Sequence, residues 1–228
     1  MWAVFKKELK SYFLSPIGYV VVGILLLVAS VFFYLTTVMY SSIDLGGLYF
    51  YTALYGLLIA VPLLTMRTFS EERKDGTEQL LLTAPRSVTS IVLGKFFAAL
   101  IVLLIAVVLT FIYYIILMFL GNPNIKTSLV TVFGFILLGA ALISFGMFAS
   151  SITENQVIAA IVSIAFYVIT WIGTPYLSQS LEPLGLMNMF NRFGNGQIAC
   201  TEVVAFISYT VLFVLLTIIV IQRRKSVK

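Results

Sequence analysis

The chain has 228 residues, of which 61% are hydrophobic and 10% are charged, and its formal net charge is +5. Soluble domains carry about a quarter charged residues. A chain this apolar therefore indicates an integral membrane protein and excludes a soluble globular one. One cysteine, Cys200, and the absence of histidine exclude an intrachain disulfide, a multi-cysteine metal site and histidine-based catalysis.

The first predicted element is an amphipathic helix over residues 1–15. Lysines occupy much of one side of it, and apolar residues recur at helical spacing on the other: Trp2, Phe5, Leu9, Tyr12 and Phe13. This pattern predicts an elbow helix lying in the inner membrane interface. Pro16 predicts a bend after it. A cytoplasmic extension of the first span is the alternative.

Six apolar stretches then follow, and each can cross roughly 30 Å of hydrocarbon as about 20 helical residues. They cover residues 17–40, 48–66, 92–120, 128–151, 156–177 and 203–221. Their apolar character is continuous rather than alternating, which favours helices over a barrel. The predicted fold class is an all-α membrane protein with six transmembrane helices in a single domain, residues 1–228.

Basic residues are distributed unevenly between the predicted loops. Twelve of the 14 Lys and Arg residues lie before the first span, between spans two and three, or after the last span, and only Lys126 and Arg192 lie on the other side. The positive-inside rule places both termini and residues 67–95 in the cytoplasm. The net positive charge is explained by this topology, and no nucleic-acid partner is expected.

The interiors of the six spans contain no Asp, Glu, Lys or Arg. Ion-coupled carriers keep ionisable groups within the membrane, so an ion-coupled carrier is a weaker alternative. The chain also has no Walker A loop and none of the catalytic motifs GxSxG and HExxH. We therefore expect a subunit that is not an enzyme, binds no cofactor of its own and takes its energy from a partner.

Small residues recur at four-residue spacing within the spans, for example Gly146 and Ser150. This spacing lets helix backbones approach closely in lipid. It predicts packing within one subunit, with a contact between subunits as the alternative.

The outer segment 178–202 is too polar to span. Leu181, Leu184, Met187 and Phe190 could share one helical face, and Gly194 and Gly196 permit a sharp turn. We expect short re-entrant helices that dip into the outer interface, with an ordinary surface loop as the alternative.

Residues 67–95 form a charged cytoplasmic insert. The order Asp75-Gly76-Thr77-Glu78 predicts a turn and a capped helix start, Gln79 to Thr83 a short helix, and Pro85 its end. Exposed leucines beside carboxylates suit a docking element for a soluble protein. A loop that merely fixes topology explains the same residues equally well.

The charged insert contains, in this order, Glu71, Glu72, Gly76, Thr77, Leu81, Leu82, Pro85, Ser87, Gly94 and Lys95. This order resembles the first cytoplasmic loop of ABC-2 type permeases. The resemblance covers nearly the whole chain. It includes the N-terminal FKKELKSYFLSPIGYV and the outer segment LGLMNMFNRFGNGQI, and it is greatest to the branch of gliding-motility and nitrous-oxide-reductase-maturation permeases.

The resemblance implies the membrane subunit of an exporter in the bacterial inner membrane. It implies a second permease, identical or related, and two cytosolic ATPases that bind ATP and Mg. The substrate path would be lined chiefly by spans one, two and five. The resemblance is compatible with an additional, extracytoplasmic accessory protein. The alternative function is an ABC-type complex that transmits force to such a partner without transport. The implied ATPase-coupling residues are Glu71, Glu72, Gly76, Thr77, Glu78, Leu81, Leu82 and Pro85.

Overall fold

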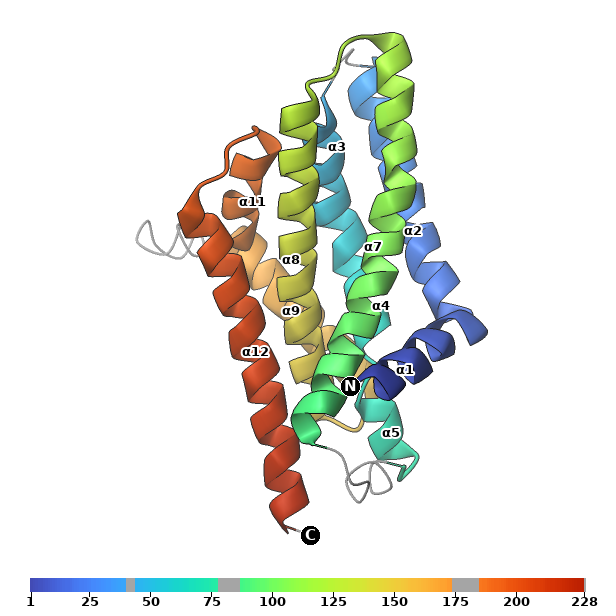
Figure 1. The fold of residues 1–228 in the computed structure, drawn as a ribbon, viewed down its shortest axis with the longest axis vertical. Helices are drawn as coiled ribbons and strands as arrows, with labels where there is room; N and C mark the ends of the chain where they lie inside the picture. Colours follow the sequence, from blue (N-terminus) through green and yellow to red (C-terminus); the bar gives the residue numbers. More distant parts are fainter. Residues whose placement is uncertain (40–43, 78–86, 174–184, 228) are drawn as a thin grey trace.

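The computed structural model describes residues 1–39, 44–77, 87–173 and 185–227, with side chains described as far as residue 224. Throughout this part of the chain every regular element is helical. The predicted all-α class is therefore confirmed. Long helices run side by side along one axis, and both termini lie at the same end of the bundle (Figure 1).

The N-terminal helix α1, Trp2–Leu14, is separate from α2, Ile17–Phe33. Ser15 between them has an extended backbone, with φ −88° and ψ 157°, and Pro16 begins the next turn, where its missing N–H breaks no helical bond. The bend predicted at Pro16 is thus present. In Figure 1 α1 lies across the foot of the bundle at an angle to α2, and α2 continues into a π-helical segment, η1, Tyr34–Met39.

The second apolar run is built from α3, Leu45–Tyr51, the π-helical η2, Thr52–Leu57, and α4, Leu58–Thr65. A tight turn leads from it into a short helix, α5, Ser70–Lys74. The predicted helix over residues 79–83 lies outside the described residues.

Three of the remaining helices are capped at the start by a polar side chain, which accepts from free N–H groups of the first turn. Ser87 caps α7, Val88–Leu120; Asn124 caps α8, Ile125–Ile152; and Asn155 caps α9, Gln156–Val168, which continues into η3, Ile169–Gly173. The third predicted span therefore begins at Val88 rather than at residue 92. The last helix, α12, covers Cys200–Val227.

Five helical runs among the described residues are long and apolar enough to cross a membrane: Ile17–Met39, Leu45–Lys74, Val88–Leu120, Ile125–Ile152 and Cys200–Arg224. The helix at the fifth predicted span, Gln156–Trp171, is apolar but shorter, and the predicted end of that span falls outside the described residues. The chain is thus a multi-pass membrane protein by helix length and composition.

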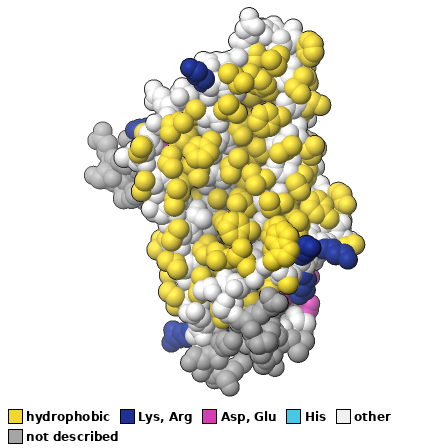
Figure 2. Space-filling view, viewed as in Figure 1, with side chains coloured by type: hydrophobic (Ala, Val, Ile, Leu, Met, Phe, Trp, Pro, Cys, Tyr) yellow, Lys and Arg dark blue, Asp and Glu magenta, His cyan; other side chains and the backbone are white. Residues whose placement is uncertain are grey.

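Helix α8 occupies the centre of the bundle. It packs against α3, α4, α7, α9, α11 and α12. Within its most apolar stretch 67% of the residues are buried inside the protein, compared with 33% for α2 and for α12. The outward sides of the peripheral helices carry large exposed hydrophobic residues (Figure 2), which is the pattern of a surface in contact with lipid.

The outer segment contains a helix, α11, Leu186–Gly194. Phe190 and Phe193 on it are fully buried, and the Thr131 hydroxyl of α8 donates to the Phe193 carbonyl at 3.1 Å. The apolar side of α11 is therefore covered by protein, while the predicted position of this helix in the outer interface stays a prediction. Gly196 forms the expected turn with φ +77°, whereas Leu181 and Leu184 lie outside the described residues.

Candidate functional site

The described part of the charged insert, with α5, lies at the end of the bundle that holds both termini (Figure 1). Glu71 and Glu72 are on α5, and Gly76 and Thr77 follow it. Gly76 has a left-handed backbone, with φ +71°, a conformation that glycine adopts without strain. The other proposed coupling residues lie outside the described residues: Glu78, Leu81, Leu82 and Pro85.

Helix α5 has its charges arranged to suit the helix dipole. Glu71 and Glu72 occupy its first turn, and Arg73 and Lys74 its last. Acidic residues near a helix N-terminus and basic residues near its C-terminus are each stabilising. This helix was not predicted from the sequence, although the signal SEERK was present there.

A buried lysine of α7 connects that helix with α1, with α5 and with the turn after α4. Lys95 of α7 is 1% exposed. Its Nζ lies 2.9 Å from Glu72 Oε1 and 3.3 Å from Glu8 Oε1, and it donates to the Thr68 carbonyl at 2.6 Å. A lysine ammonium has three donors, and these three acceptors satisfy them. The network joins α1, α5 and the turn after α4 to the start of α7.

Gly94 explains why α1 can approach α7 closely enough to form this network. A Cβ at position 94 would lie 3.1 Å from Val4 Cβ and 3.2 Å from the Met1 carbonyl oxygen. Gly94 therefore gives α1 room to lie against α7, and Lys95 then meets Glu8 on the same helix. The pair Gly94-Lys95 thus has a structural reason in this chain.

The residues of the predicted elbow do not all share one environment. Tyr12 is buried, and its hydroxyl donates to the Leu64 carbonyl at 3.3 Å. Burial, reinforced by the Glu8 carboxylate, raises the pKa of Tyr12 above its ordinary value, so the hydroxyl remains a donor at neutral pH. Phe5, Leu9 and Phe13 are partly buried against the core, whereas Trp2 is 65% exposed.

The opposite side of α5 is anchored to the end of α8. The Ser150 hydroxyl accepts from the N–H groups of Phe69 and Ser70 at 3.1 Å each, and donates to the Met66 carbonyl at 3.0 Å. Arg73 Nε lies 2.8 Å from Glu154 Oε1. The Lys95 network on one side of α5, and the contacts of Ser150 and Arg73 on the other, therefore hold α5 between α1 and α8.

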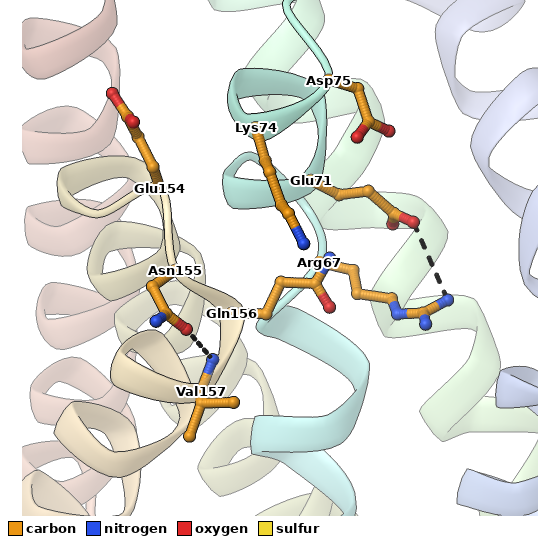
Figure 3. A pocket seen from close by; sticks show the side chains of 8 residues that line it. All are labelled: Arg67, Glu71, Lys74, Asp75, Glu154, Asn155, Gln156 and Val157. Carbon is orange, nitrogen blue, oxygen red and sulfur yellow. Dashed lines mark hydrogen bonds and ion pairs between the residues drawn. The ribbon is translucent and has the colours of Figure 1, made fainter.

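A charged cleft of about 560 Å³ separates α5 from the start of α9 (Figure 3). Arg67 Nη1 lies 3.9 Å from Glu71 Oε1 along one wall, while Glu154 and Asn155 form the opposite wall (Figure 3). A second cleft of about 280 Å³ lies between α1 and α5. Helix α5 is thus a ridge with a polar cleft on each side, and the two clefts can receive polar side chains of another protein.

The sequence model for ABC-2 family transporter proteins matches residues 50–226, more than half of the chain. The chain belongs to the ABC-2 family of transporter proteins. The predicted family is therefore confirmed, while the narrower branch stays a prediction. A search of curated proteins returned no match.

In this ABC-2 family protein the matched region contains Lys95 and α5, which forms one wall of each cleft. Helix α1, which carries Glu8, lies before the matched region. The sequence predicts that Lys95 lies in the loop leading into the third span, and this prediction is wrong because α7 begins at Val88 and buries the side chain. Glu8 was missed as well. In the sequence, Glu8 is the one acid within the lysine-rich N-terminal helix, and Lys95 is the one lysine within an apolar run. These two features are the signal that could have identified both residues.

Proposed function

We propose that this ABC-2 family protein is the membrane-spanning permease subunit of an exporter driven by a separate cytosolic ABC ATPase. The ATPase binds ATP and Mg and seats on the insert that contains α5. Two ATPases and two permeases, identical or related, form the working assembly in a bacterial inner membrane.

The observation that carries this proposal is the buried network of Lys95. A force applied to α5 reaches α7 through the pair Glu72–Lys95 and α1 through Glu8–Lys95. The hydrogen bonds of Ser150 carry it to α8. A docking loop joined in this way to three helices is suited to converting ATPase movement into tilting of the spans.

The proposal includes the arrangement in the membrane. Six spans cross it, Gln156 to residue 177 being the fifth, and α1 lies as an elbow helix in the cytoplasmic interface. Both termini face the cytoplasm, as the twelve basic residues on that side favour.

Within the insert we assign docking to the residues that the resemblance implies. Glu71, with a side chain 42% exposed, can meet the ATPase directly. Glu72 is engaged with Lys95 and holds the insert in place. The apolar anchors are Leu81 and Leu82, with Gly76, Thr77, Glu78 and Pro85 shaping the loop around them.

The test is retention of the ATPase by the purified permease. Leu81→Ala should lower the amount of co-purified ATPase per permease, because truncating an apolar anchor costs about 2 kcal/mol when the residue is a hot spot, roughly thirtyfold in affinity. Leu120→Ala, which truncates a leucine that is 59% exposed at the end of α7 remote from α5, is the matched control. Full ATPase retention and full ATP-driven activity in Leu81→Ala would leave the insert as a topology determinant only.

A further inference from the structure

The outward side of α1 combines positive charge with exposed apolar residues. Lys6, Lys7 and Lys10 are all exposed, and so are Trp2 and Leu14, at 65% and 76%. Lys6 Nζ lies 5.5 Å from the centre of the Trp2 ring. Figure 2 shows basic and hydrophobic side chains side by side at the level of α1.

This charge is not neutralised within the helix. The one acid of α1, Glu8, is turned inward to Lys95 at 3.3 Å. Among the described residues no ion pair involves Lys6, Lys7 or Lys10, although Lys7 also borders the cleft that contains Glu71 and Asp75. The network that buries Lys95 therefore also leaves the outer side of α1 uniformly basic.

We propose that the outer side of α1 is a binding surface for anionic phospholipid headgroups. The three ammonium groups contact lipid phosphates, and Trp2 and Leu14 reach the boundary with the acyl chains. Indole rings prefer this boundary, and basic residues are attracted to the anionic leaflet. The inference rests on the proposed position of α1 at the membrane interface, and adds a charge preference that this position alone does not require.

Trp2 is a built-in reporter, because the chain has only one other tryptophan, Trp171. The full chain with Trp171→Phe is placed in nanodiscs that contain equal mole fractions of phosphatidylcholine and phosphatidylglycerol, and either one or the other lipid carries bromine as a quencher. If Trp171→Phe impairs folding, the Trp2 signal is obtained instead as the difference between the wild type and Trp2→Phe.

We expect brominated phosphatidylglycerol to quench Trp2 more strongly than brominated phosphatidylcholine. Each basic residue near an anionic surface changes lipid partition by roughly fivefold, so enrichment should be severalfold at low salt and fall as salt rises. Replacing Lys6, Lys7 and Lys10 together by Gln should abolish the difference. Lys126→Gln, a lysine at the other end of the bundle, is the matched control and should leave it unchanged.

Each other outcome overturns the proposal in a recognisable way. Equal quenching by both lipids would keep α1 at the membrane and remove the charge preference. Quenching by neither lipid would remove α1 from the membrane, in favour of solvent or an acidic protein partner. Selectivity retained in the triple Gln variant would assign the lipid to other residues. None of these outcomes bears on ATPase retention, which tests the proposed function separately.

Discussion

At the scale of single residues, the buried Lys95 ammonium depends on partners from other elements at the charged end of the bundle. Removing an ammonium from water costs several kcal/mol unless charges and hydrogen bonds compensate it. Here two carboxylates and a carbonyl lie within 3.3 Å of Nζ. The residue is therefore tolerated only while α1, α5 and α7 stay together.

Lys95→Met should destabilise the protein by about 3 kcal/mol, because it leaves Glu8 and Glu72 facing each other without their shared cation. Thermal unfolding in detergent should show a lower midpoint. Lys74→Met is the control, since Lys74 is exposed on the same insert. Replacing Glu8 and Glu72 by Gln in the Lys95→Met background should recover part of the loss, and an unchanged midpoint for Lys95→Met would contradict the network.

The same network changes the meaning of a docking test suggested by sequence alone. Glu72→Arg is expected from the sequence to repel a basic site on the ATPase while leaving the rest of the permease intact. In the structure this substitution also brings a second cation against Lys95, so lower ATPase retention would not by itself report docking. Leu81→Ala avoids that ambiguity.

At the scale of elements, α5 depends on the end of α8 for its position. Ser150 accepts from two backbone N–H groups at the start of α5, where the first N–H groups of a helix have no acceptor within the helix. The turn after α4 and the C-terminal end of α8 are thereby held as one unit.

Ser150→Ala should loosen α5, because two buried N–H groups lose their acceptor at about 1–3 kcal/mol each. Hydrogen exchange should become faster over residues 66–74 and unchanged in the middle of α7. Ser151→Ala is the matched control, since within the described part of the chain that buried hydroxyl donates to the Phe148 carbonyl of its own helix and to nothing in α5. Equal exchange in the two variants would exclude Ser150 as the anchor.

Close packing of α4 on α8 depends on Gly146. A Cβ there would lie 2.2 Å from Thr65 Oγ1 and 2.9 Å from Thr65 Cβ. Gly146→Ala should therefore destabilise by about 1–3 kcal/mol through overpacking, although alanine is otherwise the better helix former. Gly23→Ala, where a Cβ meets nothing within 4 Å, should be neutral or slightly stabilising in the same thermal unfolding measurement; similar midpoints for both variants would contradict this contact.

At the scale of the whole molecule, the two ends of the bundle differ in charge. The end with α1, α5 and the C-terminal part of α12 holds most of the basic residues. The opposite end holds the ion pair of Arg192 Nη1 with Glu202 Oε1 at 2.7 Å. This asymmetry is what orients such a protein in a membrane.

Thiol labelling of intact cells should report the orientation. In a background with Cys200→Ser, an impermeant reagent should label Asp44→Cys from outside and should label Lys74→Cys only after the membrane is opened. Asp44 precedes α3 and Lys74 ends α5, and the start of α3 and the end of α5 lie at opposite ends of the bundle, so each position serves as the control for the other. Labelling of Lys74→Cys alone in sealed cells would reverse the proposed topology.

The sequence by itself determined the helical class, the membrane location, the bend at Pro16 and the turns at Gly76 and Gly196, because these depend on local run lengths and backbone conformations. Gly146 packs on Thr65 of the same chain, which agrees with the prediction that small residues at four-residue spacing serve helix packing within one subunit. Only the tertiary structure decided that Lys95 is buried between Glu8 and Glu72, and that the apolar side of α11 packs on α8. Both depend on which distant segments meet. A lone lysine in an apolar run has the same local sequence signal whether it ends at the surface or between two carboxylates contributed by other helices.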